Sequence, residues 1–343
     1  MFKDNTVFVI GAGSSAEFGF PIGSGLTTAI KTNCDFVYDH GSFTKGPSRI
    51  VNHYDRTIGR TKHGEVHEYN KRLEASWRIR DGIESADSID EYIYRYSDDP
   101  IIAEVGKLQI AYAISLAEED SILGSKRGFD QSISGANDTW IWAFFKTLIS
   151  GIKASEIEKI GSNITIICFN YDRCIEQYLE HAIARSFHDV SLAQAREIVR
   201  NIRIVHPYGK LGELDDLPFG ASEKFARMAE NLITWSETIR EPEILDDIQR
   251  AITGAKRIVF LGFAFANQNM QLLNAKPTSK NYSGPRVYST GYLLPRETEE
   301  SLKLNINGLY SDGVAEGQLQ NIHFQYGAKC KEFFDIHRLN LAR

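Results

Sequence analysis

The sequence predicts an α/β protein built on a parallel sheet, with a helical module inserted between the first strand and the later ones. A short apolar run from Val7 to Ile10 is followed at once by glycines, as in a buried strand that turns directly into a helix. Similar apolar runs return after residue 160, and each ends in polar residues. Between them, residues 70–155 carry apolar side chains at helical spacing. This order is typical of a Rossmann-like parallel sheet with helices on both faces.

The turn after the first strand has the spacing of a dinucleotide-binding loop. Its two glycines are followed by Ala16 in the third position of the G-x-G-x-x-G/A pattern. The first glycine permits a tight turn, and the second lets the backbone approach a pyrophosphate that a side chain would block. The N–H groups of the next helix and two serine hydroxyls can then hold the negative charge. The predicted binding residues are Gly11, Ala12, Gly13, Ser14 and Ser15, although a tight turn in any α/β protein could look similar.

Two features differ from the pattern of an ordinary dehydrogenase. Gly19-Phe-Pro21 ends the helix after the glycines early, because proline disfavours helical geometry in the residue before it. No acidic residue ends an apolar strand about 20 residues further on, where a ribose-binding carboxylate is expected. Asp35 has roughly that distance, but the residues before it do not resemble a strand. The sequence therefore disfavours an enzyme that transfers hydride.

Composition sets broad limits on the function. The 343 residues are 42% apolar and carry a net charge of −6, which allows one large domain or two and argues against a nucleic-acid-binding protein. The four cysteines form no C-x-x-C pair, so no structural zinc site is expected and a reducing compartment is favoured. Neither a signal peptide nor an apolar run of membrane-spanning length is recognisable. We expect a cytoplasmic protein.

The middle of the chain is predicted to be helical. Ser88 and Glu91 have the spacing of a capping box that opens a helix. Helical periodicity continues over residues 101–116 and again over 138–152. The aromatic residues in the last of these segments are expected to form core or a subunit interface rather than a ligand site.

These patterns suggest a division of the chain. Residues 1–35 and 160–343 are predicted to form the dinucleotide-binding domain, and residues 36–159 an inserted, mostly helical module. Within the insertion, residues 35–71 mix glycine, proline, histidine and charge with little periodicity. We expect an irregular surface excursion there.

Three later strands are predicted to bring polar residues to the carboxyl edge of the sheet. They span residues 164–169, 202–205 and 257–261, and further strands are expected at 287–289 and 322–326. Open α/β sheets bind ligands at this edge. The residues that follow the three strands are Asn170, Asp172, His206, Gly262, Phe263 and Asn267.

Each of the polar residues also has a structural alternative. Asn170 could cap the next helix, Asp172 could interact with the dipole of that helix, and His206, which precedes Pro207, could belong to a turn.

The order of these motifs resembles the sirtuin superfamily, in particular the divergent bacterial sirtuin-like proteins of antiphage defence. Gly11-Ala-Gly-Ser-Ser15 with Gly19-Phe-Pro21 is similar to the opening of that family, and Asn170-Tyr-Asp172 stands where sirtuins carry an Asn-x-Asp triplet. His206 with its following glycines is similar to the catalytic histidine segment, and Leu261-Gly-Phe to a late glycine-rich loop. Ser88 to Tyr92 resembles a segment in the helical part of the divergent members.

This resemblance implies an enzyme that binds NAD⁺ as its substrate and needs no metal. The chain lacks the two cysteine pairs of deacylating sirtuins, which favours hydrolysis of NAD⁺ to nicotinamide and ADP-ribose over protein deacylation. Asn170 would orient the ribose hydroxyls or the water. Asp172 would bind the carboxamide or stabilise positive charge, and His206 would act as general base. Gly262, Phe263 and Asn267 would line the adenosine side.

The resemblance also implies a biological setting. An effector of antiphage defence that depletes NAD⁺ must be held inactive until it is triggered. A homo-oligomer and a HerA-like hexameric ATPase are the expected partners, with no direct contact to nucleic acid or membrane. A catalytically silent module that senses NAD⁺ or ADP-ribose is the alternative from another functional class.

Overall fold

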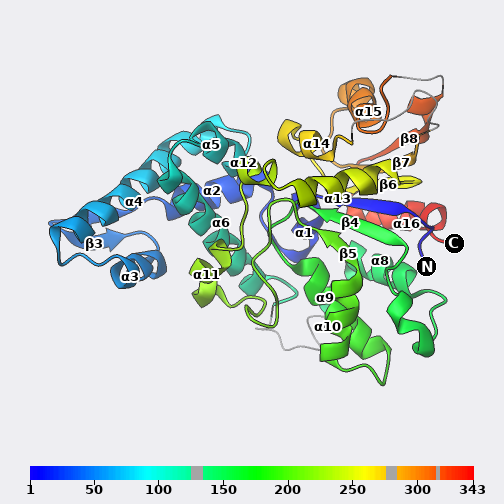
Figure 1. The fold of residues 1–343 in the computed structure, drawn as a ribbon, viewed down its shortest axis with the longest axis horizontal. Helices are drawn as coiled ribbons and strands as arrows, with labels where there is room; N and C mark the ends of the chain where they lie inside the picture. Colours follow the sequence, from blue (N-terminus) through cyan, green and yellow to red (C-terminus); the bar gives the residue numbers. More distant parts are fainter. Residues whose placement is uncertain (125–133, 276–283, 314–316) are drawn as a thin grey trace.

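A computed structural model describes residues 1–124, 134–275, 284–313 and 317–343. Its centre is a six-stranded parallel sheet with the strand order β5-β4-β1-β6-β7-β8 (Figure 1). Counted along the chain this is the order 3-2-1-4-5-6, that of dinucleotide-binding sheets. The strands are β1 (Thr6–Ile10), β4 (Ile164–Cys168), β5 (Arg203–Val205), β6 (Arg257–Leu261), β7 (Arg286–Gly291) and β8 (Ile322–Tyr326).

The predicted α/β fold is confirmed, and all six predicted strands are present within a few residues of their expected bounds. The five residues of β1 are all buried, because helices cover both faces of the sheet. In Figure 1, α13 lies above the sheet and α8 and α9 lie below it. Ile10, the last residue of β1, pairs with Cys168 on one side and Leu261 on the other. The strand order reverses between β1 and β6, which is where open sheets of this kind bind their ligands.

Helices make up most of the remaining described chain. They are α1 (Ala12–Ser15), α2 (Gly23–Asn33), α3 (Ser48–Thr57), α4 (His63–Gly82), α5 (Ile89–Arg95), α6 (Pro100–Asp120), α8 (Trp140–Ile149), α9 (Cys174–Ser186), α10 (Leu192–Asn201), α11 (Phe225–Ala229), α12 (Trp235–Thr238), α13 (Pro242–Thr253), α14 (Asn267–Leu273), α15 (Glu299–Gly308) and α16 (Cys330–Leu341).

Residues 36–120, which we call the helical insert, extend from the carboxyl edge of the sheet (Figure 1). The prediction of an irregular excursion over residues 35–71 is wrong. An antiparallel hairpin of β2 (Val37–Asp39) and β3 (Ser42–Lys45) is followed there by α3 and the start of α4. Helix α3 buries only Ile50, Val51 and Tyr54, and this narrow apolar face is hard to recognise among so many charged residues.

The helices predicted further along are present. Ser88 Oγ accepts a hydrogen bond from Glu91 N at 3.1 Å at the start of α5. Helix α6 is apolar enough to cross a membrane by length and composition, but 61% of that stretch is buried within the molecule, as in a core helix. In α8 the ring of Phe144 packs against Phe8 of β1 at 5.1 Å between centroids. This aromatic segment is therefore part of the core.

The turn after β1 lies in close contact with the turn after β6. Gly11 N donates to Leu261 O at 3.0 Å, and Gly13 N donates to Gly262 O at 2.9 Å. A Cβ atom added to Gly11 would lie 2.6 Å from Gly262 O, and one added to Gly13 would lie 2.8 Å from Gly262 Cα. Gly262 itself has a φ of 58° and would overlap with the amide of Ser14 if it had a side chain. Here the glycines are required by backbone contact within the protein, before any ligand is considered.

Gly13→Ala is therefore expected to lower the free energy of unfolding of the unliganded protein by about 1–3 kcal/mol, the usual cost of inserting a methyl group into a tightly packed site. Chemical denaturation followed by circular dichroism would measure the change. Gly64→Ala is the control, because Gly64 lies in α4 with no atom within 4 Å of an added Cβ. A Gly13→Ala protein as stable as its parent would mean that this glycine serves only a ligand.

Candidate functional site

Asn170 lies immediately beyond β4 and ties that strand to the glycine turn. Its Nδ2 donates to Gly11 O at 3.2 Å and to Ser15 Oγ at 2.8 Å, and lies 3.3 Å from Ser14 Oγ. A carbonyl can only accept, so the amide nitrogen must be the atom that faces Gly11. Asn170 is thus not the cap of α9. Its Oδ1 accepts no hydrogen bond from any residue that the structure describes, which leaves one strong acceptor for a ligand.

Asp172 contacts the glycine turn and also interacts with the start of α9, which is the structural alternative considered from the sequence. Its Oδ2 accepts a hydrogen bond from Ser15 Oγ at 2.7 Å, and its Oδ1 accepts one from Cys174 N, the first residue of α9, at 3.1 Å. Burial raises the pKa of this carboxyl, and the two hydrogen bonds oppose that rise. Asp172 therefore joins the start of α9 to the glycine turn.

His206 follows β5, and both of its ring nitrogens face acceptors. Nε2 lies 2.9 Å from Glu176 Oε1, and Nδ1 lies 3.4 Å from the backbone oxygen of Asn170. Gly209 N also donates to His206 O at 3.1 Å, so the predicted turn is present as well. In this conformation both ring nitrogens face protein atoms.

Glu176 is a member of this group that the sequence analysis missed. It lies in the first turn of α9, and its Oε1 contacts His206 and also Lys210 Nζ, at 3.1 Å. Burial opposes ionisation of this carboxyl, but the positive charges of His206 and Lys210 outweigh it and hold the pKa well below its ordinary value. Its Oε2 is buried and has no hydrogen-bond partner in the part of the chain that the structure describes. Glu176 follows Asp172 by one helical turn, and that spacing was the available signal.

Residues predicted for the adenosine side fall into three environments. Gly262 forms the contact with the glycine turn, and Phe263 packs in the core with its ring centroid 5.3 Å from that of Phe169. Asn267 is exposed at the first position of α14. Gly262 lies against Gly11, Gly13 and Ser14, and the backbone of Phe263 also lies close to Gly11, since a Cβ added there would be 2.8 Å from Phe263 Cα. Asn267 remains accessible to a ligand above the edge of the sheet.

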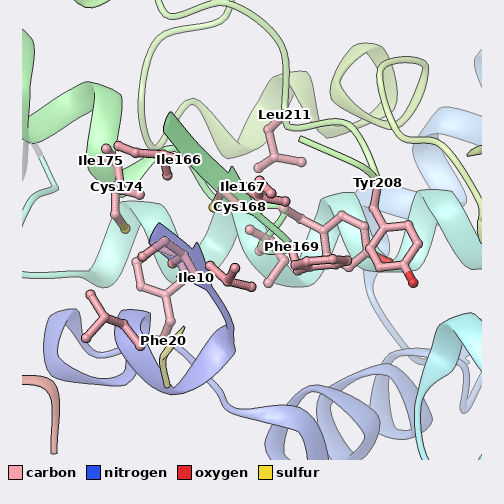
Figure 2. Packing of buried hydrophobic residues seen from close by; sticks show 14 of the residues in the cluster. Ile10, Phe20, Ile166, Ile167, Cys168, Phe169, Cys174, Ile175, Tyr208 and Leu211 are labelled. Carbon is pink, nitrogen blue, oxygen red and sulfur yellow. The ribbon is translucent and has the colours of Figure 1, made fainter. Parts of the chain in front are cut away.

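The aromatic residues near the edge belong to a continuous packed layer. Figure 2 shows Phe169 and Tyr208 beside each other beyond the end of β4, and their ring centroids are 5.8 Å apart. Tyr208 OH donates to Asn269 Oδ1 of α14 at 2.7 Å. Phe169 also packs against Phe263, so these apolar contacts continue from the segment after β4 to the segment after β6.

The amides of the glycine turn are partly occupied by the protein itself. Besides the bond from Gly13 N to Gly262 O, Ser14 N donates to Gly11 O at 2.9 Å. Ala12 is exposed, whereas both serines are buried, and Trp140 Nε1 donates to Ser14 O at 2.9 Å. Helix α1 has only four residues, so its dipole adds little positive potential. A pyrophosphate would therefore depend on the exposed outer side of the turn.

Two further features bear on what the site could hold. Within the described residues, no group of three or more His, Cys, Asp or Glu side chains is placed to bind a metal ion. A surface hollow of about 750 Å³ is lined by α13 residues near the start of β6 and by Ala275. This hollow lies near the residues that precede β6, whereas Asn170 lies beyond the carboxyl end of β4. We assign the hollow no part in the site.

Glu176→Gln is expected to lower the free energy of unfolding by on the order of 2 kcal/mol at neutral pH, less than for a fully enclosed ion pair because Lys210 is partly exposed. The lowered pKa of Glu176 means that its contribution is present above its ordinary pKa of 4.5 and is lost as the pH falls below that value. The difference between parent and variant should therefore shrink from pH 7 to pH 3 in urea denaturation. A difference independent of pH would contradict this assignment.

Comparisons of the chain with protein-family models, with curated proteins and with solved structures found no match. The resemblance to sirtuin-like proteins therefore stays a prediction that rests on the motifs alone.

Proposed function

We propose that the protein is an NAD⁺ glycohydrolase that cleaves the bond between nicotinamide and ribose with water. The observation that carries the proposal is the position of Asn170. Its amide nitrogen is fixed by the glycine turn, and its Oδ1 accepts no hydrogen bond within the described residues, at the carboxyl edge of a sheet with dinucleotide-binding strand order. An acceptor held in this way suits a ribose hydroxyl or a water molecule.

The reaction makes modest demands on acid–base chemistry. Water adds to C1′ of the ribose, the C–N bond to nicotinamide breaks, and the bonding electrons leave with the ring, which becomes neutral, while the water that has added releases one proton to the solvent. The transition state should resemble an oxocarbenium ion, as in other cleavages at an anomeric carbon. Asn170 would orient the ribose or the water, and the carboxylate of Asp172 would stabilise the positive charge that develops on the ribose. The exposed side of the turn from Gly11 to Ser15 would hold the pyrophosphate.

His206 is assigned a positioning role in the conformation described here. Its ring faces Glu176 and the carbonyl of Asn170, so it supports the backbone of the residue that orients the substrate. Service as general base would require the ring to turn toward the substrate, because Nε2 here faces Glu176 and Nδ1 faces the backbone oxygen of Asn170. A highly electrophilic transition state needs little deprotonation of the attacking water, so the positioning role is compatible with hydrolysis.

The wider setting follows from the family resemblance alone. A role as an antiphage effector, a cytoplasmic location, self-association and a HerA-like ATPase partner are all proposals on that basis. The second candidate function is a silent sensor of NAD⁺ or ADP-ribose. It is favoured by one observation: Ser15, Asp172 and His206 are all engaged by partners within the protein.

Asn170→Ala should lower NAD⁺ turnover by at least about 100-fold, the scale expected when a reacting group loses its alignment. Chromatography of NAD⁺ incubated with each purified protein would measure nicotinamide and ADP-ribose. Asn201→Ala is the matched control, because Asn201 is exposed at the end of α10 and far from the turn in sequence. Thermal unfolding of both variants separates lost activity from lost folding.

The outcomes discriminate between the functions. Products from the parent and the control but not from Asn170→Ala support hydrolysis at this site. Equal turnover in all three proteins would refute the site. Tight NAD⁺ binding with no turnover, with or without the candidate ATPase, would favour the sensor.

A further inference from the structure

The four residues that follow Phe169 alternate between two sets of partners. Asn170 and Asp172 contact the glycine turn through Ser15. Tyr171 and Arg173 instead contact the helical insert, through Asp90 and Glu118. The chain bends at Tyr171 and Asp172, and through these contacts a single short segment joins two parts of the molecule. The proposed reacting residues, Asn170 and Asp172, contact the glycine turn, and the residues next to them contact the helical insert.

The first contact joins α5 to the residue between Asn170 and Asp172. Tyr171 OH donates a hydrogen bond to Asp90 Oδ1. Tyr171 is buried, and its ring centroid lies 6.2 Å from that of Tyr208. Burial raises the pKa of Asp90 to about 6, an unusual value for a carboxyl in the first turn of a helix. The main cause of this raised pKa is that the carboxyl is removed from water, so no neighbouring charge is needed to explain it.

The second contact joins α6 to Arg173. Two parallel bonds connect Arg173 to Glu118, one of them between Nε and Oε1 at 3.0 Å, and both side chains are fully buried. Arg173 also donates to the backbone oxygen of Leu217, and Gly220 N donates to Glu118 Oε2 at 3.0 Å. A bidentate arginine–carboxylate pair has a fixed geometry. Glu118 therefore holds both the segment after β4 and the chain that follows Lys210.

We propose that Asp90 and Glu118 are positioning residues through which the helical insert sets the alignment of Asn170 and Asp172. This inference rests on the proposed function, because alignment matters only where these residues act on a ligand. Movement of α5 or α6 would change the reaction rate without any contact between the insert and the substrate. The insert is thereby the control element of the site.

Tyr171 is the residue on whose contacts the alignment of Asn170 depends most. Its backbone oxygen accepts a hydrogen bond from Leu211 N at 3.2 Å, so the same residue also connects to the segment that carries His206. Loss of the contact to Asp90 would free the ring on one side and remove one of the contacts that hold the segment around Asn170. An error of about 1 Å in such alignment can reduce a rate roughly 100-fold.

Tyr171→Phe and Asp90→Ala are expected to lower kcat for NAD⁺ hydrolysis by roughly 10- to 100-fold, with little change in the Kd for NAD⁺ measured by calorimetry. Asp90→Asn should retain most of the parental kcat, because its amide oxygen can still accept from Tyr171 OH. The double variant should be no slower than the slower single variant, since each change removes the same contact.

Matched controls are available on the same helix. Tyr94→Phe removes an exposed hydroxyl from α5 and Asp87→Asn removes an exposed charge just before it, and both should behave like the parent. A parental kcat in Tyr171→Phe, or independent effects in the double variant, would overturn the inference while leaving the proposed function intact. Absence of turnover in the parent and in every control would instead refute the proposed function.

Hydrogen exchange tests the inference without relying on turnover. In Asp90→Ala the amides of residues 169–174 and of Leu211 should exchange faster than in the parent, whereas Tyr94→Phe should leave them unchanged. Exchange in Asp90→Ala that matches the parent over these residues would overturn the inference. This measurement also avoids substitution of the buried Glu118–Arg173 pair, whose loss could prevent folding.

Discussion

The arrangement of the whole carboxyl edge depends on how closely the turn after β1 approaches the turn after β6. Two backbone hydrogen bonds join them, and neither Gly11 nor Gly13 could carry a side chain at this separation. The approach sets the positions of Ser14 and Ser15, and these two hydroxyls together with Gly11 O then determine where the amide of Asn170 can lie. The glycine pattern that is usually explained by a bound pyrophosphate has here a reason within the protein. A turn fixed in this way is already ordered when a ligand arrives, which lowers the entropy cost of binding.

The polar groups of the site satisfy one another, and this determines which atoms remain for a ligand. Buried polar atoms without partners are costly, and Ser15, Asp172 and His206 all avoid that cost by contacts within the chain. The amide oxygen of Asn170 is an acceptor without a partner among the described residues. Glu176 shows the same principle with charge, because the positive charges of His206 and Lys210 stabilise its buried carboxylate. The second oxygen of Glu176 also has no partner among these residues, so the network is nearly but not completely satisfied.

The fold was predictable from the sequence to the extent that burial leaves a local pattern. Strands such as β1 and β6 are covered on both faces, so they read as uninterrupted apolar runs, and their order along the chain was enough to predict a parallel sheet. Helix α3 was missed because only three of its residues are buried. In the site, Asn170, Asp172 and the glycine turn could be found because each directly follows a strand. The contact of Glu176 with His206 could not, since it depends on how α9 packs beside β5. The same holds for Asp90, whose sequence context indicates only the start of a helix.

The position of the helical insert in the chain explains why it can act on the site. It leaves the sheet after β1 and returns before β4, and these two strands are neighbours. Because β1 ends at the carboxyl edge, the insert emerges beside the residues that follow β4, as Figure 1 shows. Side chains on its near surface then meet the segment after β4, where alternate residues face the insert and the glycine turn. An ordinary βαβ crossover would cover a face of the sheet and have no such access. Insertion at this point therefore places a group of helices in contact with Tyr171 and Arg173, the neighbours in sequence of the proposed reacting residues, and leaves the sheet that supports them unchanged.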